Sequence, residues 1–322
     1  MAVPTDDAPR ILVVRRDNIG DLACTTPLIA GLRARWPKAR LAALVTTYNA
    51  EVLARNPALE AVYTYEKLKH RSEGLWSYVR ARLAQVRQLR RERWDAVLVP
   101  APGPQALKMA HDLRPGQVLA SPTTFRKGLH EVERTFELGR ALGLSGAPGP
   151  MQVYPDPARQ RALDGTLGDG PLVAVHMSAR RPAQQWPLER YAALCAELAG
   201  THRVLLLWAP GSKDDARHPG DDAAAQEVLR RADSGSVIPL PTPDLATLVA
   251  ALSRASLVVC PDGGAMHLAA ALGKPVVALF GDSPVERWRP WGVPYRVLCP
   301  DTRDLADLPL APVIDACRAL AP

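Results

Sequence analysis

Short apolar runs alternate with longer segments of helical periodicity along the first half of the chain. The runs at residues 11–14, 41–46 and 96–99 are rich in aliphatic residues and predict buried parallel strands. A helical pattern covers residues 22–36. A second helical pattern precedes the third strand, and its apolar positions are Leu75, Val79, Leu83, Val86 and Leu89. Strands that alternate with helices in this order predict a doubly wound α/β domain.

The same alternation restarts in the second half. Residues 143–171 are rich in Gly, Pro, Asp and Ala and are the best candidate for a linker. The strands expected beyond it are residues 172–176, 204–208, 257–260 and 276–280. The expected helices are residues 188–199, 244–254 and the segments near 223–231 and 265–272. We therefore expect two Rossmann-like domains, residues 1–160 and 161–322, that face a shared central cleft with the carboxyl ends of their strands.

Composition narrows the class of protein. Of the 322 residues, 47% are hydrophobic and 23% are charged, which is typical of a globular protein and excludes fibrous and disordered classes. No apolar run approaches the ~20 residues that span a bilayer, and the polar start lacks the pattern of a signal peptide. The five cysteines are scattered without a CxxC pair, which favours reduced thiols in the cytoplasm. Aromatic residues make up only 5%, which disfavours a nucleic-acid binder built on stacking.

The net charge of +7 is concentrated in one segment. Residues 67–93 contain nine basic residues against Glu73 and Glu92, so the remainder of the chain is close to neutral. The nine are Lys67, Lys69, Arg71, Arg80, Arg82, Arg87, Arg90, Arg91 and Arg93. Two interpretations stay open. The segment is either a solvated helix face whose arginine stems cover apolar surface, or a surface for an anionic substrate or membrane.

The sharpest motif is the Asp-Gly-Gly-Ala turn at residues 262–265, between an expected strand and an expected helix. A helix start presents unpaired N–H groups and a partial positive charge, and glycines let a phosphate approach the backbone closely. Asp262 and His267 flank this turn, so both could reach a ligand above the helix end. The alternative is a structural turn in which Asp262 caps the helix and His267 is only packed.

Two further motifs follow expected strands. Residues 17–21, Asp-Asn-Ile-Gly-Asp, match neither the dinucleotide fingerprint nor a P-loop. Asp21 could take a proton from a substrate hydroxyl as a general base, or it could be a helix N-cap. In the other motif, residues 177–187, Arg180 and Arg181 could hold a diphosphate by charge-assisted hydrogen bonds. Its alternative is a solvated loop whose Trp186 packs on the domain surface.

Together these segments resemble glycosyltransferase family 9, the heptosyltransferase family. The matching segments are residues 11–21 with 26–28, residues 185–187, the turn and helix at 262–271, and residues 279–281. Their order and spacing cover most of the chain. The resemblance implies a GT-B fold, in which the N-terminal domain binds the acceptor and the C-terminal domain binds the nucleotide-sugar donor.

The resemblance also implies a reaction. The family transfers heptose from ADP-heptose to the inner core of lipopolysaccharide, with inversion and without a metal or other cofactor, and this chain has no Asp-x-Asp pair. Asp21 matches the catalytic base, and Asn18 and Gly20 lie on the acceptor side. The positions that match the donor site are Ser178, Arg180, Arg181, Gln184, Asp262, Gly263, Gly264, Ala265 and His267. In the basic segment, Arg87, Arg90 and Arg91 would face the anionic acceptor.

Two positions depart from the family pattern. The family commonly has Lys where this chain has Gln184, and Ser or Thr where it has Gly263. Arg180 or Arg181 could supply the missing positive charge. Both departures concern the donor side and leave open a different sugar donor or altered donor binding, while the expected fold is unchanged.

The expected protein is a cytoplasmic monomer, peripheral on the inner face of the cytoplasmic membrane, with no nucleic-acid partner. Three alternatives remain open from the sequence. One is a transferase of the same family with another nucleotide-sugar or a non-lipopolysaccharide acceptor. Another is a sugar-nucleotide 2-epimerase of the same architecture, which would form its product from the donor alone. The third is a non-catalytic accessory protein, against which the presence of Asp21 argues.

Overall fold

The computed structural model describes residues 7–66, 75–122, 124, 127–168, 170–215, 219–233 and 235–321. The chain divides into two compact units, Met1–Gln152 and Val153–Pro322. The division falls between Gln152 and Val153, whereas the sequence placed it after residue 160. Each unit is described by itself.

The first unit is built on a five-stranded sheet with the order β3-β2-β1-β4-β5. All neighbouring strands are parallel, and β1 pairs with both β2 and β4. The strands are β1 (Arg10–Val14), β2 (Arg40–Thr46), β3 (Ala61–Tyr65), β4 (Ala96–Val99) and β5 (Gln117–Ala120). The helices are α1 (Ile19–Ala23), α2 (Thr26–Arg35), α3 (Leu75–Arg91), α4 (Pro104–Asp112) and α5 (Glu131–Glu137), with short 3-10 helices at Ala50–Leu53 and Leu138–Leu142.

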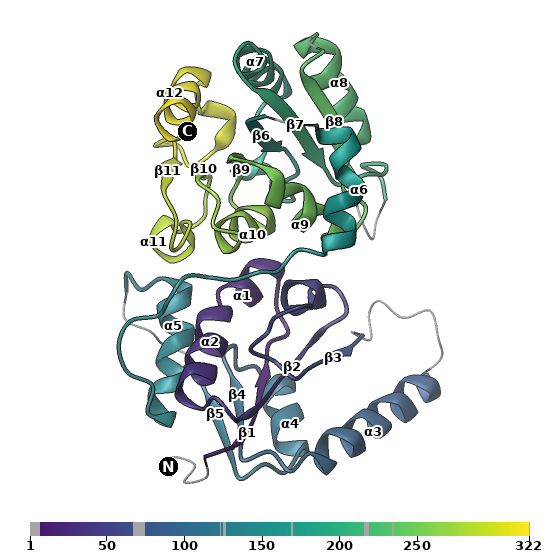
Figure 1. Ribbon diagram of the computed structural model, residues 1–322, viewed down its shortest axis with the longest axis vertical. Helices are drawn as coiled ribbons and strands as arrows, with labels where there is room; N and C mark the ends of the chain where they lie inside the picture. The colour runs from purple at the N-terminus through teal and green to yellow at the C-terminus, as the bar shows by residue number, and fades with distance from the viewer. Residues whose placement is uncertain are drawn as a thin grey trace. The chain divides into compact units, whose positions relative to one another are not determined.

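Helices cover both faces of this sheet (Figure 1). On one face, Leu12 and Val14 of β1 join a buried cluster with Val86 and Leu89 of α3 and with residues of α4. Helices α2 and α5 pack together on the other face. Because successive strand residues point to opposite faces, odd-numbered positions of β1 point to the α5 side and even-numbered positions to the α3 and α4 side.

The second unit contains a six-stranded parallel sheet with the order β11-β10-β9-β6-β7-β8. The strands are β6 (Leu172–His176), β7 (Arg203–Trp208), β8 (Val237–Pro241), β9 (Leu257–Pro261), β10 (Val276–Leu279) and β11 (Tyr295–Leu298). The helices are α6 (Pro157–Leu167), α7 (Leu188–Ala199), α8 (Asp222–Ala232), α9 (Leu245–Arg254), α10 (Gly264–Ala271), α11 (Val285–Trp288) and α12 (Leu310–Leu320), with 3-10 helices at Pro182–Gln184 and Leu305–Asp307. Both units thus have the predicted α/β fold.

Both sheets have the strand order of a doubly wound nucleotide-binding fold. Counted within each unit, the orders are 3-2-1-4-5 and 3-2-1-4-5-6. The strand order reverses between β1 and β4 in the first sheet and between β6 and β9 in the second. In open α/β sheets, ligands bind outside the carboxyl ends of the strands at such a switch point. The segments after β1, β4, β6 and β9 are therefore where functional residues are expected.

The structure corrects three local predictions. The helical pattern at residues 22–36 is two helices, because Thr25 turns the chain and donates its hydroxyl to the Asp21 carbonyl. The linker predicted at residues 143–171 is shorter, since Pro157–Leu167 forms α6, capped by the Asp156 side chain on the amides of Ala158 and Arg159. The sequence also missed four strands, which are β3, β5, β8 and β11.

Candidate functional site

A buried arginine organises the carboxyl edge of the first sheet. Arg15 follows β1, and its side chain is only 1% exposed. Its guanidinium lies 2.9 Å from carboxylate oxygens of both Asp21 and Glu131 and 3.2 Å from that of Asp17. Thr135 accepts a further hydrogen bond, at 3.3 Å. One cation therefore gathers carboxylates from the loop after β1, from α1 and from α5.

The charge balance of this cluster favours an ionised arginine. Burial disfavours the charged guanidinium, but the negative charges of Asp17, Asp21 and Glu131 outweigh it and hold the pKa of Arg15 above its ordinary value. Arg134 also lies 3.9 Å from Glu131 and adds a second positive charge. Buried charges of this kind are stable only when they are paired and hydrogen-bonded.

Asp21 is held in one orientation by two partners. Its Oδ1 accepts from Arg15, and its Oδ2 accepts from the backbone and side-chain nitrogens of Asn18 at 3.3 and 3.2 Å. Asp21 is the third residue of α1 and Asn18 is the N-cap, so Asp21 is not the N-cap itself, but the two residues form a capping box in which the Asp21 carboxylate accepts from the Asn18 amide. The Asp21 side chain is 13% exposed, and an ionised carboxylate has further lone pairs for a substrate hydroxyl. Gly20 is buried within α1, whereas Asn18 is exposed.

The basic segment lies elsewhere in this unit. Lys67, Lys69 and Arg71 are outside the described residues. Arg87, Arg90 and Arg91 are exposed on α3, which covers the face of the sheet opposite to α5 (Figure 1). Within the described structure, none of the hydrogen bonds of Asp21 involves these arginines. Their role in binding an acceptor stays a prediction.

In the second unit, the two motifs meet at the switch point. The loop with Ser178, Arg181 and Gln184 follows β6, and the Asp-Gly-Gly-Ala turn follows β9, the strand paired with β6. Gly263 occupies the N-cap position of α10, and no side chain caps this helix, so the interpretation of Asp262 as a cap is wrong. A methyl group added at Gly263 would meet no protein atom within 4 Å. The backbone at the start of α10 is therefore open to a ligand.

Asp262 connects the two loops. It accepts a hydrogen bond of 2.9 Å from the Gln184 side chain, and the Arg181 guanidinium lies 3.9 Å away. Burial raises the pKa of Asp262, while a hydrogen bond from Ser283, the charge of Arg181 and the bond from Gln184 act in the opposite direction. Gln184 also donates to the Ser283 hydroxyl at 3.0 Å. The neutral Gln184 thus belongs to the network that orients Asp262.

Among the arginines of this loop, Arg181 is bound to the turn after β10. Its side chain is 49% exposed, pairs with Asp282 at 3.2 Å and donates to the Ser283 hydroxyl. An exposed guanidinium that already contacts this network could also reach a bound phosphate. Arg180 is exposed at the adjacent position. The positive charge expected from this loop is therefore present, although its partner in the structure is a carboxylate.

The remaining predicted donor residues are packed more deeply. The Ser178 hydroxyl accepts from the Ala209 amide at 2.9 Å. His267 is 3% exposed and packs edge-on against Trp288, with ring centroids 5.8 Å apart, as the packing interpretation predicts. Trp186 is 2% exposed and donates to the Leu308 carbonyl at 2.9 Å, so its placement on the domain surface is wrong. The contribution of Ser178 and His267 to donor binding stays a prediction.

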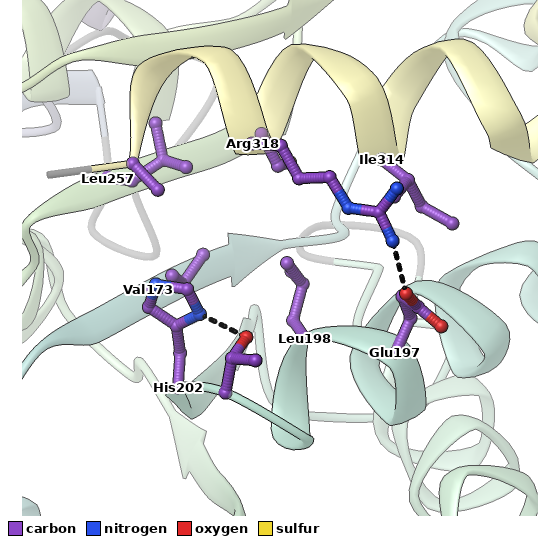
Figure 2. A pocket seen from close by; sticks show the side chains of 10 residues that line it. Val173, Glu197, Leu198, His202, Leu257, Ile314 and Arg318 are labelled. Carbon is purple, nitrogen blue, oxygen red and sulfur yellow. Dashed lines mark hydrogen bonds and ion pairs between the residues drawn. The ribbon is translucent and has the colours of Figure 1, made fainter.

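One small cavity lies away from the carboxyl edges of both sheets. It measures about 80 Å³ and is lined by Val173 near the start of β6, Leu257 at the start of β9, and residues of α7 and α12 (Figure 2). At its rim, Arg318 pairs with Glu197 at 2.7 Å. Because Val173 and Leu257 lie at the amino ends of their strands, this cavity is at the edge opposite to Asp262.

The sequence missed several residues that shape these edges. Glu131 contacts Arg15 from 116 positions away, and Ser283 contacts Gln184 from 99 positions away. Neither residue stands in a motif, so no local signal points to it. Arg15 does have a local signal in the sequence, because an arginine that directly continues a buried strand must find a charged partner at the strand end.

The strand orders, the carboxylate after the first strand and the open helix start at the second switch point define a two-domain α/β protein of the GT-B type. The family model of glycosyltransferase family 9 (heptosyltransferase) matches residues 82–309. The chain belongs to this family and is a glycosyltransferase.

Individual relatives support the same assignment. The chain is 24% identical over 295 residues to lipopolysaccharide heptosyltransferase 3 of Escherichia coli K12, covering 84% of this chain and 82% of the relative. The solved glycosyltransferase family 9 structure from Veillonella parvula has a TM-score of 0.84 at 18% identity and covers 98% of this chain and 99% of that chain. The E. coli heptosyltransferase WaaC with ADP-2-deoxy-2-fluoro heptose has a TM-score of 0.75 at 22% identity, covering 97% and 100%. These similarities confirm the GT-B fold.

None of the helices in the described ranges has the length and apolar character that a membrane span requires. The same part of the chain holds no group of three or more side chains placed to bind a metal ion.

Proposed function

We propose that this glycosyltransferase moves a heptose from ADP-heptose to a hydroxyl group of an anionic acceptor, the inner core of lipopolysaccharide. The observation that carries the proposal is the Asp21 carboxylate, held at the switch point of the first sheet by Arg15 and Asn18. The name of the E. coli relative and the ligand of the WaaC structure support the sugar, the nucleotide and the acceptor.

The reaction is a single displacement. The acceptor hydroxyl attacks the anomeric carbon and gives its proton to Asp21, while the bond from that carbon to the diphosphate breaks. The nucleoside diphosphate leaves with the electron pair, and the configuration at the anomeric carbon is inverted. The backbone amides of Gly263, Gly264 and Ala265 at the start of α10, together with Arg181, would stabilise the growing negative charge. No step requires a metal ion, so transfer should persist in the presence of a chelator.

The first test is the Asp21→Asn variant. Loss of the base should lower kcat by about 10²–10⁴-fold and leave ADP affinity nearly unchanged. Asp17→Asn is the matched control, because Asp17 also contacts Arg15 but is 29% exposed and lies before the helix. Retained transfer in Asp21→Asn, or an equal loss in Asp17→Asn, would contradict the assignment of the base.

The donor can be tested separately. A thermal-shift panel of ADP-, GDP- and UDP-sugars should show stabilisation by ADP-heptose above the others, because a ligand that binds only the folded state stabilises it by mass action. A stronger shift with another nucleotide would assign a different donor. Product formed from the donor alone, without acceptor, would favour an epimerase.

We also propose that α3 binds the surface of an anionic membrane, where such an acceptor would lie. Its exposed apolar residues follow helical spacing, with Trp76 81%, Val79 36% and Leu83 48% exposed. Exposed arginines flank them at positions 80, 87, 90 and 91. An apolar stripe beside basic residues is the pattern of a helix that lies in a membrane interface.

Reversing the charge of Arg87, Arg90 and Arg91 tests this surface. Each basic residue near an anionic leaflet contributes about 1 kcal/mol, so the triple variant should lose most of its binding to vesicles that contain anionic lipid. Trp76→Ser should weaken binding without changing the charge. Binding that stays unchanged in both variants would favour a simple solvated face.

A further inference from the structure

Arg15 and Arg16 are neighbours in the chain but have opposite surroundings. Arg15 continues the odd-numbered positions of β1 toward α5, where three carboxylates neutralise it. Arg16 points to the other face, where its partners come from β3 and α4. This difference follows from the alternation of side chains along a strand.

The partners of Arg16 are all neutral. Its Nε donates to the Tyr65 hydroxyl, and its Nη2 donates to the Gln105 side-chain oxygen at 2.9 Å. Its guanidinium carbon lies 5.3 Å from the centroid of the Tyr65 ring. Among the described residues, no carboxylate pairs with Arg16. A half-buried guanidinium is therefore held in place by neutral hydrogen-bond partners.

A second arginine lies near the same ring. The guanidinium carbon of Arg82, on α3, is 6.0 Å from the Tyr65 centroid. Tyr65 thus lies near two positive charges, from the loop after β1 and from α3, and the negative charge of Asp17 also acts on it. An anion bound beside both guanidinium groups is attracted by each of them.

We propose that Arg16, Tyr65 and Arg82 form a binding site for an oxyanion group, a phosphate or a carboxylate, on the acceptor. The proposal rests on the proposed function, because it names the acceptor chemistry that this unit would recognise.

The donors of this cluster match such a group. Arg16 uses Nε and Nη2 for protein contacts and retains Nη1, and a guanidinium fits the oxygens of phosphate or carboxylate in its plane. The Tyr65 oxygen accepts from Arg16, so its own O–H remains for a ligand. Burial raises the pKa of Tyr65, which keeps this hydroxyl protonated.

The position of the cluster also fits a ligand site. Arg16 follows β1 and contacts Gln105 on the helix after β4, so it bridges the two strands at the switch point of the first sheet. Asp21 follows β1 at the same carboxyl edge, in the helix that begins three residues after Arg16. An anionic group bound by Arg16 would therefore hold the acceptor on the edge that carries the base.

The test measures anion binding without requiring transfer. Inorganic phosphate and acetate are titrated separately by calorimetry into protein saturated with ADP, which occupies the donor side. At least one anion should bind the wild-type protein, and Arg16→Gln should weaken that binding about tenfold or more. Tyr65→Phe should weaken it less, since one hydroxyl donor is lost. Arg35→Gln is the matched control, because Arg35 is exposed and lies 5.1 Å from the Trp36 ring but stands at the end of α2, at the amino edge of the sheet.

Acceptor kinetics identify the source of the anion. With an inner-core acceptor that carries both carboxylate and phosphate groups, Arg16→Gln should raise the acceptor KM about tenfold and leave ADP affinity unchanged. Esterifying the carboxylates or removing the phosphates of the acceptor should abolish the difference between wild type and variant, and the treatment that does so identifies the group bound by Arg16.

Some results would overturn the inference. These are an absence of anion binding in the wild-type protein, equal binding in Arg16→Gln, or an unchanged difference with both altered acceptors. Failure of the proposed function has another signature, which is retained transfer in Asp21→Asn or no stabilisation by any nucleotide-sugar.

Discussion

The carboxyl edges of the two sheets share a strand order but use different chemistry. In the first sheet, the edge is made of charged side chains that close around Arg15, which is 1% exposed. In the second, the edge is an open glycine turn beside a network of Gln184, Ser283 and Asp262 that the half-exposed Arg181 joins. A group that removes a proton must be an oriented side chain, whereas a diphosphate can be held by backbone amides. One architecture therefore supports two tasks through the residues at its switch points.

The largest expected effect is on the free energy of unfolding. It compares Arg15, at the carboxyl edge of the first sheet, with Arg181, at that of the second. Arg15→Met removes the cation that pairs with Asp17, Asp21 and Glu131, so we expect the free energy of unfolding to fall by about 3–5 kcal/mol. Arg181→Met removes a guanidinium that is 49% exposed and should cost at most about 1 kcal/mol. Chemical denaturation of both variants measures the difference. Equal losses would contradict the expectation that loss of the buried arginine is the more destabilising.

The second effect is a pH dependence that arises from a buried histidine of the second sheet. Burial lowers the pKa of His176, at the carboxyl end of β6, from 6.5 to about 4. Between these values the unfolded chain binds the proton and the folded chain does not, so stability should fall as the pH drops from about 6.5 to about 4. The full difference corresponds to about 3 kcal/mol.

His176→Gln should remove this part of the pH dependence, measured as the unfolding free energy at pH 7 and pH 5. His111→Gln, at an exposed position of the first unit, is the control and should leave the pH dependence as it is. An unaltered slope in His176→Gln would contradict the assignment to this residue.

The smallest effect concerns the open helix start. Gly263→Val places a side chain where the protein has no atom within 4 Å, so folding should tolerate it while ADP affinity falls about tenfold. Gly103→Val is the matched control, because Gly103 is the N-cap of α4 in the first unit and has the same open surroundings. An equal drop in ADP affinity in both variants would contradict the assignment of this turn to the donor site.

The fold was predictable at the centre of each sheet and not at its margins. All seven strands predicted from the sequence are confirmed, and the four that were missed, β3, β5, β8 and β11, are the edge strands of the two sheets. Central parallel strands are buried on both faces and form continuous apolar runs, whereas edge strands tolerate polar residues and proline. In β8, Pro239 and Pro241 are exposed and interrupt the apolar pattern, which hides the strand from the sequence.

Prediction of the two sites from the sequence was also only partly successful. The sequence located Asp21 and the turn at residues 262–265, because both directly follow central strands and residue type alone suggests their chemistry. It offered helix capping as the alternative role of Asp21 and Asp262. In the structure Asp21 takes part in a capping box with the N-cap Asn18, whereas Gly263 is the N-cap of α10 and Asp262 does not cap it. The basic segment and its apolar positions were visible in the sequence, but only the structure shows that Trp76 and Leu83 on α3 are exposed beside its arginines.

The sequence by itself determined the α/β class, the central strands and the positions of the motifs, because burial of strand residues and helix-start chemistry are local properties. Only the tertiary structure decided which partners meet at each strand end. Arg15 and Arg16 are identical in type and adjacent in sequence, yet one meets Glu131 and the other meets Tyr65. Strand alternation sends them to opposite faces, and the packing of α5, β3 and α4 determines which arginine pairs with carboxylates and which has neutral partners.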